Sequence, residues 1–176
     1  MRIVYNASAR RIGNISLNDA LESGPCLLPK IFDIIVRFRS YKYAIISDIK
    51  AAFLQIRVAE EDRNYLRFLW VDDIAKEEPQ IFVKRFTSVL FGLTSSPFLL
   101  NATIATHMKQ YFHINEPVIK QFLRDLYMDD VISGTQSVDE GFKFYLFSKS
   151  RMLEGGFELR KWQSNSLELL GKIREH

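Results

Sequence analysis

Two adjacent carboxylates, Asp129 and Asp130, stand between the apolar runs 126–128 and 131–132, and Gly134 follows shortly after. Such runs are typical of strands, and a short turn between two strands makes a hairpin. The sequence therefore predicts a hairpin with the acid pair at its tip or edge. Because side chains alternate between faces along a strand, we expect only one of the two carboxylates to point in a given direction. A plain surface turn is the alternative, since Asp is a common turn residue.

This hairpin would hold two negative charges close together. Carboxylates in that position repel each other unless a cation joins them, and hard divalent ions prefer oxygen ligands. A divalent cation at the tip is therefore one interpretation of the motif. We also expect that neutralising one crowded acid relieves repulsion in the metal-free protein.

A third acid, Asp48, ends the nearly continuous apolar run 43–47. This run predicts a buried central strand, followed by a turn or short helix. An acid at the end of such a strand is compatible with a helix cap and equally with a functional site. If its strand neighbours the hairpin, Asp48 and Asp129, together with Asp130 and a backbone carbonyl, form an oxygen-rich site for two divalent ions.

The rest of the chain mixes helical and strand patterns. Apolar residues at helical spacing within 31–38 predict a helix that packs into the core. The pair Gly155–Gly156 predicts the end of a long amphipathic helix, and Ser164–Asn165 is expected to cap a last one. The order predicts an α+β fold, an antiparallel sheet backed by helices. The expected helices are 29–39, 97–111 and 138–154, and the further strands are 2–5, 65–71, 81–89 and 157–162.

Composition sets outer limits on the function. The 176 residues suffice for one domain, with or without an appendage. A net charge of +3 is compatible with a polyanionic partner. Cys26 is the only cysteine, which excludes a disulfide framework or a cysteine metal cluster and suits a reducing compartment. No apolar run is long enough to cross a bilayer, so no membrane partner is expected.

Several blocks of the sequence, taken in chain order, resemble the reverse transcriptase of Bel–Pao-type long-terminal-repeat retrotransposons. The four residues 127–130, Tyr-Met-Asp-Asp, are only moderately specific alone, but they are highly specific after the blocks that precede them. Together the blocks span nearly the whole chain. They are MRIVYNASA (1–9), SLNDALESGP (16–25), SDIKAAFLQI (47–56), LFGLTSSPFLLNA (90–102), LRDLYMDDVISG (123–134) and GFELRKWQSN (156–165).

The resemblance implies a polymerase right-hand fold that lacks its thumb. The whole chain, 1–176, would be one reverse transcriptase domain. Residues 1–22 and 56–95 would form a partial fingers subdomain. Residues 23–55 and 96–176 would form the palm, with a ferredoxin-like core. The strand-like sequence at the start suggests that the chain begins inside a larger protein.

The resemblance also implies roles at the acids. Asp48 and Asp129 would hold the metals, with Ile49 contributing its carbonyl, and Asp130 would act less directly. Lys161 matches a lysine near the departing pyrophosphate, where it would donate a proton or act as a positive clamp. A solvated surface lysine is the alternative for Lys161.

Further positions would contact the substrates. Arg2 matches an arginine that contacts the triphosphate, for which a planar charged fork is suited. Phe53 matches a bulky gate that crowds a ribose 2′-OH and so selects deoxynucleotides, with core packing as its alternative. Phe91 and Gly92 would line the nucleotide pocket, where glycine allows close approach of the backbone. The expected template and primer contacts are Ser96, Pro97, Tyr127 and Met128.

Three positions depart from the family pattern. Asn6 stands where an acid is usual, which would weaken an internal ion pair. Met128 is the retroviral form, where close relatives more often have Val. Phe91 replaces the glutamine of retroviral enzymes.

The implied activity is RNA-directed DNA synthesis with two Mg²⁺ per site, Mn²⁺ being the alternative. The implied partners are an RNA or DNA template with its primer, deoxynucleoside triphosphates, and the remainder of a polyprotein with thumb, RNase H, protease and integrase. The implied location is a cytoplasmic virus-like particle whose product goes to the nucleus. The alternatives are an inactive nucleic-acid-binding remnant, an RNA-templated RNA polymerase and a nucleotide cyclase. Phe53 argues against ribonucleotides, and the ordered blocks argue against a cyclase.

Overall fold

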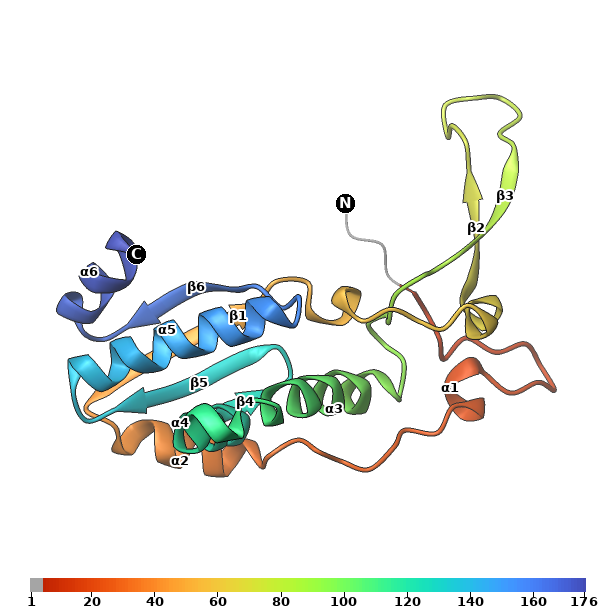
Figure 1. Cartoon of the computed structure of the whole chain (residues 1–176). Helices are drawn as coiled ribbons and strands as arrows, with labels where there is room; N and C mark the ends of the chain where they lie inside the picture. The colour runs from red at the N-terminus through yellow and green to blue at the C-terminus, as the bar shows by residue number, and fades with distance from the viewer. Residues whose placement is uncertain (1–4) are drawn as a thin grey trace. The chain divides into compact units, whose positions relative to one another are not determined.

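The computed structural model describes residues 5–176 and divides the chain into two compact units (Figure 1). Unit 1 comprises the chain up to Ser23 together with Phe53–Ser96, and unit 2 comprises Gly24–Ala52 together with Pro97–His176. The sequence placed these boundaries at 22/23, 55/56 and 95/96. That the units are fingers and palm stays a prediction. The expected strand 2–5 lies almost wholly outside the described residues.

Unit 2 contains a four-stranded antiparallel sheet in the order β4-β5-β1-β6. Every neighbouring pair is antiparallel, and β1 pairs with both β5 and β6. The predicted α+β class, with an antiparallel sheet backed by helices, is therefore confirmed. The strands are β1 (Tyr43–Ile49), β4 (Leu126–Tyr127), β5 (Asp130–Thr135) and β6 (Leu159–Ser164).

Strand β1 is buried on one face only, whereas its apolar run predicted burial on both. Ile45, Ser47 and Ile49 are buried, and the residues between them are half-buried. Alternation of this kind arises because successive side chains point to opposite faces. The second face, which carries Ile46 and Asp48, is therefore available to form a site.

The helices of unit 2 supply the other half of its core. Helix α5 runs along the sheet (Figure 1) and contacts β1, β5 and β6, while α4 contacts β5. The rings of Phe122 and Phe144 lie with their centroids 6.3 Å apart between α4 and α5. The helices are α2 (Ile31–Ser40), α3 (Ser96–Lys109), α4 (Phe112–Asp125), α5 (Val138–Glu154) and α6 (Leu167–Glu175).

Local capping fixes where two of these helices begin and end. Helix α5 begins with a capping box between Ser137 and Glu140 and ends at the predicted glycine pair. The predicted cap of the last helix is wrong, because the hydroxyl of Ser166 accepts the bond from the Leu169 N–H at 3.2 Å. Asn165 instead ties the start of β1, where its amide oxygen accepts from the Ala44 N–H at 2.8 Å.

Unit 1 has a small core and a long exposed hairpin. The core consists of Ala7, Leu66, Leu90 and Leu93, with partly buried apolar residues around it. Strands β2 (Arg67–Val71) and β3 (Ile81–Arg85) pair as an isolated antiparallel ribbon. The remaining elements are α1 (Leu17–Ala20), η1 (Ala52–Gln55, at the unit boundary) and η2 (Glu61–Leu66). Within residues 5–176, no helix combines the length and apolarity that crossing a membrane requires.

Candidate active site

The acid pair lies on the predicted hairpin. Tyr127 pairs with Asp130, which leaves Met128 and Asp129 as the loop between β4 and β5. Met128 has a φ of 55°, the left-handed conformation that tight hairpin loops require. A side chain other than glycine in that conformation costs about 1–2 kcal/mol. The hairpin holds its tip in this conformation despite that cost.

The register of the sheet brings Asp48 opposite Asp130. The two are cross-strand partners in the β1–β5 pair, and directly opposite residues of an antiparallel pair share a face. The expectation that Asp130 points partly away is therefore wrong. Asp129 lies in the loop, with its carbonyl accepting a bond from the Ile49 N–H at 2.7 Å. Asp48 lies within β1, so the helix-cap interpretation of this residue is also excluded.

A bulge in β6 determines where Lys161 points. Ile46 pairs with Gln163 and Asp48 pairs with Arg160, so one residue of β1 faces two of β6. Bulges re-aim side chains and often lie beside functional sites. Lys161 has a φ of 54° within this bulge. Ser47 closes the irregular region by donating its hydroxyl to the Arg160 carbonyl at 3.0 Å.

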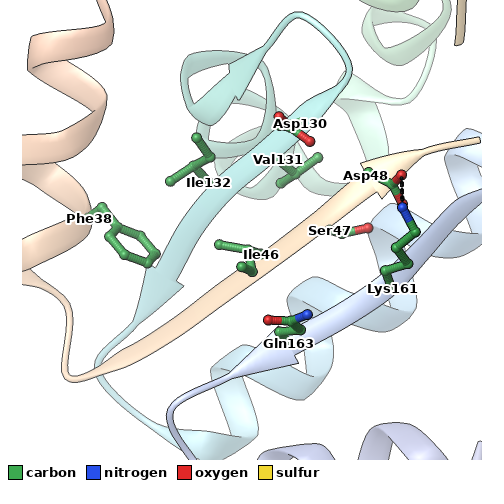
Figure 2. Close-up of a pocket in the computed structure, with 9 residues that line it drawn as sticks. All are labelled: Phe38, Ile46, Ser47, Asp48, Asp130, Val131, Ile132, Lys161 and Gln163. Atoms are coloured by element: carbon green, nitrogen blue, oxygen red, sulfur yellow. Dashed lines mark hydrogen bonds and ion pairs between the residues drawn. The ribbon is translucent and has the colours of Figure 1, made fainter.

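Two cations hold one oxygen of Asp48. The Lys161 Nζ lies 3.0 Å from Asp48 Oδ2, and an Arg160 Nη2 lies 3.2 Å from the same atom. Figure 2 shows Lys161 reaching from β6 to Asp48 on β1. The other oxygen, Oδ1, is buried and accepts no hydrogen bond from any of residues 5–176. One oxygen of Asp48 is thus bound by two cations, and the other is a buried acceptor without a hydrogen-bond partner among the described residues.

The two facing acids have pKa values shifted in opposite directions. Burial would raise the pKa of Asp48, but hydrogen bonds and charge from Lys161 and Arg160 outweigh it and lower that pKa. Burial raises the pKa of Asp130, and the charges of Asp129 and Asp48 raise it further. The three carboxylates therefore share one electrostatic environment, in which the charge of Lys161 acts on Asp130 but no cation among residues 5–176 forms an ion pair with it.

A hollow of about 430 Å³ opens beside these acids (Figure 2). Its floor is the face of the sheet that carries Ile46 and Asp48, and α2 borders it through Phe38. Asp129 is not among the lining residues. The lining residues are Phe38, Ile46, Ser47, Asp48, Asp130, Val131, Ile132, Lys161 and Gln163.

The donor set suits a hard divalent cation. The Oδ1 atom of Asp48 has no hydrogen-bond partner among residues 5–176, and the pKa of the Asp130 carboxyl group is raised by burial and by neighbouring negative charge. Both groups offer oxygen atoms that a bound cation would stabilise. Among residues 5–176, however, no group of three or more His, Cys, Asp or Glu side chains is already placed to hold a metal ion. A set of three acidic ligands would therefore need the Asp129 side chain to join Asp48 and Asp130, and a cation on Oδ2 of Asp48 would need Lys161 to leave that oxygen.

The other predicted site residues divide between the two units. Pro97, Tyr127 and Met128 belong to unit 2, with Pro97 in the first turn of α3. Phe53, Phe91, Gly92 and Ser96 belong to unit 1. Arg2 lies outside the described residues. The roles of all these residues at a substrate stay predictions.

The unit 1 residues have structural contacts of their own. Phe53 is 6% exposed, and its ring meets that of Phe91 edge to face at a centroid distance of 4.7 Å. Gly92 has a φ of 88°, which favours glycine, and its carbonyl accepts from Asn18 at 2.9 Å. The Ser96 hydroxyl donates to the Leu90 carbonyl at 2.6 Å. Core packing of Phe53 is therefore observed.

Sequence reasoning missed two residues that organise the site. Arg160 binds Asp48, and the Arg-Lys pair on a predicted strand was a signal that could have pointed to it. Asp125 lies buried just before the hairpin and accepts bonds from Ser133, Arg37 and Arg124. No spacing rule marks Asp125, because its partners come from three separate elements.

Comparison with known families gives one match. The family model described as reverse transcriptase (RNA-dependent DNA polymerase) matches residues 4–162. The matched range includes Asp48, the hairpin acids and Lys161. A search of the curated proteins found no match.

Proposed function

Because the chain belongs to the reverse transcriptase family, whose members are RNA-directed DNA polymerases, we propose that it adds deoxynucleotides to a primer 3′-OH by a two-metal mechanism. The observation that carries the proposal is the cross-strand pairing of Asp48 with Asp130, beside Asp129 at the hairpin tip. Asp48 and Asp130 line one hollow, and the charge of Asp129 acts on Asp130, so the three carboxylates form a charge concentration that a globular protein stabilises with cations.

The acids are the proposed ligands of two Mg²⁺ ions, or of Mn²⁺. Asp48 and Asp129 bind directly, the carbonyl of Ile49 contributes an oxygen, and Asp130 faces the same side as Asp48. Two bound ions supply positive charge that stabilises both the attacking and the leaving oxygen of phosphoryl transfer. Lys161 then serves the departing pyrophosphate as a positive clamp or proton donor, which its position on the hollow supports.

The substrate contacts are proposed from the ordered sequence blocks. Arg2, Phe91 and Gly92 bind the nucleotide, and Phe53 excludes a ribose 2′-OH. Ser96, Pro97, Tyr127 and Met128 contact the template and primer. A net charge of +3 supports a polyanionic partner.

The wider context follows from the same blocks. We assign the chain to the Bel–Pao type, as the fingers and a ferredoxin-like palm of a right-hand polymerase within a larger polyprotein. The polyprotein would supply the thumb, RNase H, protease and integrase. Synthesis would occur in a cytoplasmic virus-like particle, with the DNA product destined for the nucleus.

The direct test is primer extension on an RNA and on a DNA template. The 176-residue chain and a longer chain that includes a thumb are compared, each with Mg²⁺ and with Mn²⁺. Extension that needs deoxynucleotides and a divalent ion, and that Asp48→Asn abolishes, supports the proposal. Asp139→Asn is the matched control, since it removes a carboxylate that is 80% exposed and pairs with Lys172.

A second candidate function is nucleic-acid binding without catalysis. The observation that favours it is the ion pairing of Asp48, which neutralises the acid without any metal. The 176-residue chain and the longer chain would then both bind a primer–template, but neither would extend it with Mg²⁺ or with Mn²⁺. That result would favour an inactive remnant over a polymerase.

A further inference from the structure

Lys161 occupies a position that a bound metal ion would need. Its ammonium group contacts Oδ2 of Asp48, the acid that the proposed function makes a metal ligand. We propose that Lys161 is a tethered counter-cation of the metal-free site and must leave Asp48 when a divalent ion binds. The proposal rests on the proposed function, because it concerns the same acids.

The backbone is built to make this contact. Successive residues of a regular strand point to opposite faces, so Arg160 and Lys161 could not both reach one carboxylate oxygen from a regular strand. The bulge in β6 and the φ of 54° at Lys161 turn both side chains toward Asp48. The left-handed conformation is disfavoured for a side chain such as lysine. The surrounding sheet maintains this conformation, and its result is a second cation on Asp48.

Lys161 also acts on more than one acid. Its charge faces both Asp48, whose Oδ2 lies 3.0 Å from the Lys161 Nζ, and Asp130, which lines the same hollow. A divalent ion between the same two acids would do the same with twice the charge. Lys161 and the ion therefore compete for the same negative charge.

Of the two cations on Asp48, Lys161 is the one that can leave. Its side chain is 67% exposed, whereas that of Arg160 is 40% exposed and has a buried Nε. Arg160 is also the cross-strand partner of Asp48, and its carbonyl is bound by Ser47. An exposed ion pair contributes little to stability, so a divalent ion can displace the lysine without disturbing the sheet.

Displacement has a consequence for the reaction. While Lys161 is paired with Asp48, its charge is unavailable to a phosphate group. Binding of the metal frees the ammonium beside the hollow, where the proposed function places the departing pyrophosphate. Lys161 would thus be released after the metal ion binds. During catalysis the lysine and the metal ion would not compete for Asp48.

The test measures Mg²⁺ affinity by calorimetry on the full 176-residue chain after removal of metals with EDTA. Lys161→Gln should bind Mg²⁺ about threefold to tenfold more tightly than the parent. Loss of the exposed ion pair alone accounts for a few-fold increase in Mg²⁺ affinity. Loss of a positive charge near the ion increases the affinity further. Lys161→Arg, which keeps a cation, should restore an affinity near that of the parent.

Lys172→Gln is the matched control, because it removes a lysine that pairs with Asp139 at 2.9 Å on the surface. Its Mg²⁺ affinity should equal that of the parent. If Lys161→Gln binds Mg²⁺ with unchanged or weaker affinity while Asp48→Asn loses binding, the counter-cation proposal is overturned and the proposed function stands. If Asp48→Asn binds Mg²⁺ as well as the parent does, the metal site itself is wrong and both proposals fail.

Discussion

At the scale of single residues, Asp48 and Asp130 show how neighbours on one sheet face acquire different properties. Both are carboxylates on paired strands, yet within residues 5–176 only Asp48 has cations at ion-pair distance. Sequence reasoning gave Asp130 a less direct role than Asp48 and Asp129, and it expected that neutralising one crowded acid relieves repulsion. The contacts restrict that expectation to Asp130, because Asp48 contributes two ion pairs that its neutralisation would remove.

We expect opposite effects of the two Asn substitutions on the metal-free protein at pH 7. Asp48→Asn should lower the melting temperature, because it removes ion pairs worth about 1 kcal/mol together. Asp130→Asn should raise it, because the raised pKa means that folding disfavours the charged form. A change of about 1 kcal/mol corresponds to roughly 2–4 °C in a chain of this size. Thermal melts in EDTA measure both, and equal shifts in one direction would contradict the assignment.

The pH dependence of stability should separate the same two acids. The pKa of Asp48 is lowered by folding, so its contribution is present above the unfolded value of about 3.9 and is lost as pH falls through the folded pKa. The contribution of Asp130 to stability has the opposite sign. The charged Asp130 destabilises the folded protein above its raised folded pKa, and this destabilisation disappears as pH falls toward the pKa of the unfolded state. The Asp130→Asn advantage should therefore shrink on mild acidification, before the Asp48→Asn deficit does. Urea unfolding at a series of pH values checks this order.

Polymerase activity should depend on all three acids. Because the register places Asp130 on the same face as Asp48, we expect Asn at 48, 129 or 130 each to lower kcat by at least about a hundredfold, the usual effect of removing one transition-state stabiliser. Asp139→Asn should leave kcat unchanged. Single-turnover extension measures the effect, and a near-parent rate for Asp48→Asn together with Asp129→Asn would exclude the two-metal assignment.

At the scale of elements, the ion pairs and hydrogen bonds of the buried Asp125 hold the base of the β4–β5 hairpin. Asp125, at the end of α4, accepts a bond from the Ser133 hydroxyl on β5 at 2.7 Å. Its other oxygen accepts from Arg37 of α2 at 3.3 Å and from Arg124 at 2.9 Å. The carboxylate is 1% exposed. One acid therefore links α2, α4 and β5 immediately before the tip that carries Asp129.

Breaking this network should be costly. Asp125→Ala leaves the half-buried Arg37 and the exposed Arg124 without their acid and removes an acceptor of the buried Ser133 hydroxyl, which together should cost about 3 kcal/mol. Ser133→Ala removes one bond to a charged group and should cost about 1.5–3 kcal/mol. Asp33→Ala, on the exposed side of α2, should change stability by less than about 0.5 kcal/mol. Urea denaturation measures the three values, and equal small losses would mean that the network does not support the hairpin.

The same elements show what a sequence pattern can and cannot predict. The hairpin and α5 were predicted because local signals determine them: apolar runs around a turn, and a glycine pair after a helical period. Helix α2 was predicted as a core helix, yet only Ile34 is buried and Ile31 and Ile35 are exposed. Periodicity indicates which face is apolar but not which partner covers it.

The bulge in β6 and the contact of Arg160 could not be predicted, because both depend on how β1 and β6 align. The shift in register between Ile46 and Asp48 lets two neighbouring basic side chains, those of Arg160 and Lys161, meet the acid. Such alignment is a tertiary property. The identities of the acids were thus accessible from sequence, while their pairing and counter-ions required the fold.

At the scale of the whole molecule, the proposed functional residues divide between two units. The carboxylates and Lys161 belong to unit 2, and Phe53 and Phe91 belong to unit 1. A role for Phe53 in choosing the sugar therefore requires both units to act on one nucleotide. The observed packing of Phe53 gives a competing account, in which the ring serves only the stability of unit 1.

Substitution at Phe53 distinguishes these accounts when stability and selectivity are measured together. Phe53→Val removes much of a buried ring and should cost a few kcal/mol in either case, at the lower end of about 3–5 kcal/mol for full truncation to Ala. If Phe53 is also the gate, the ratio of kcat/KM for deoxynucleotides over ribonucleotides should fall by at least about tenfold, because the clash with the 2′-OH is lost.

Leu66→Ala is the matched control, since Leu66 is 5% exposed and lies in the core of unit 1 without a proposed substrate contact. A similar loss of stability with unchanged selectivity is expected for Leu66→Ala. If Phe53→Val also keeps the parent selectivity in an active enzyme, the ring is a core residue alone, and the choice of sugar must come from another part of the chain.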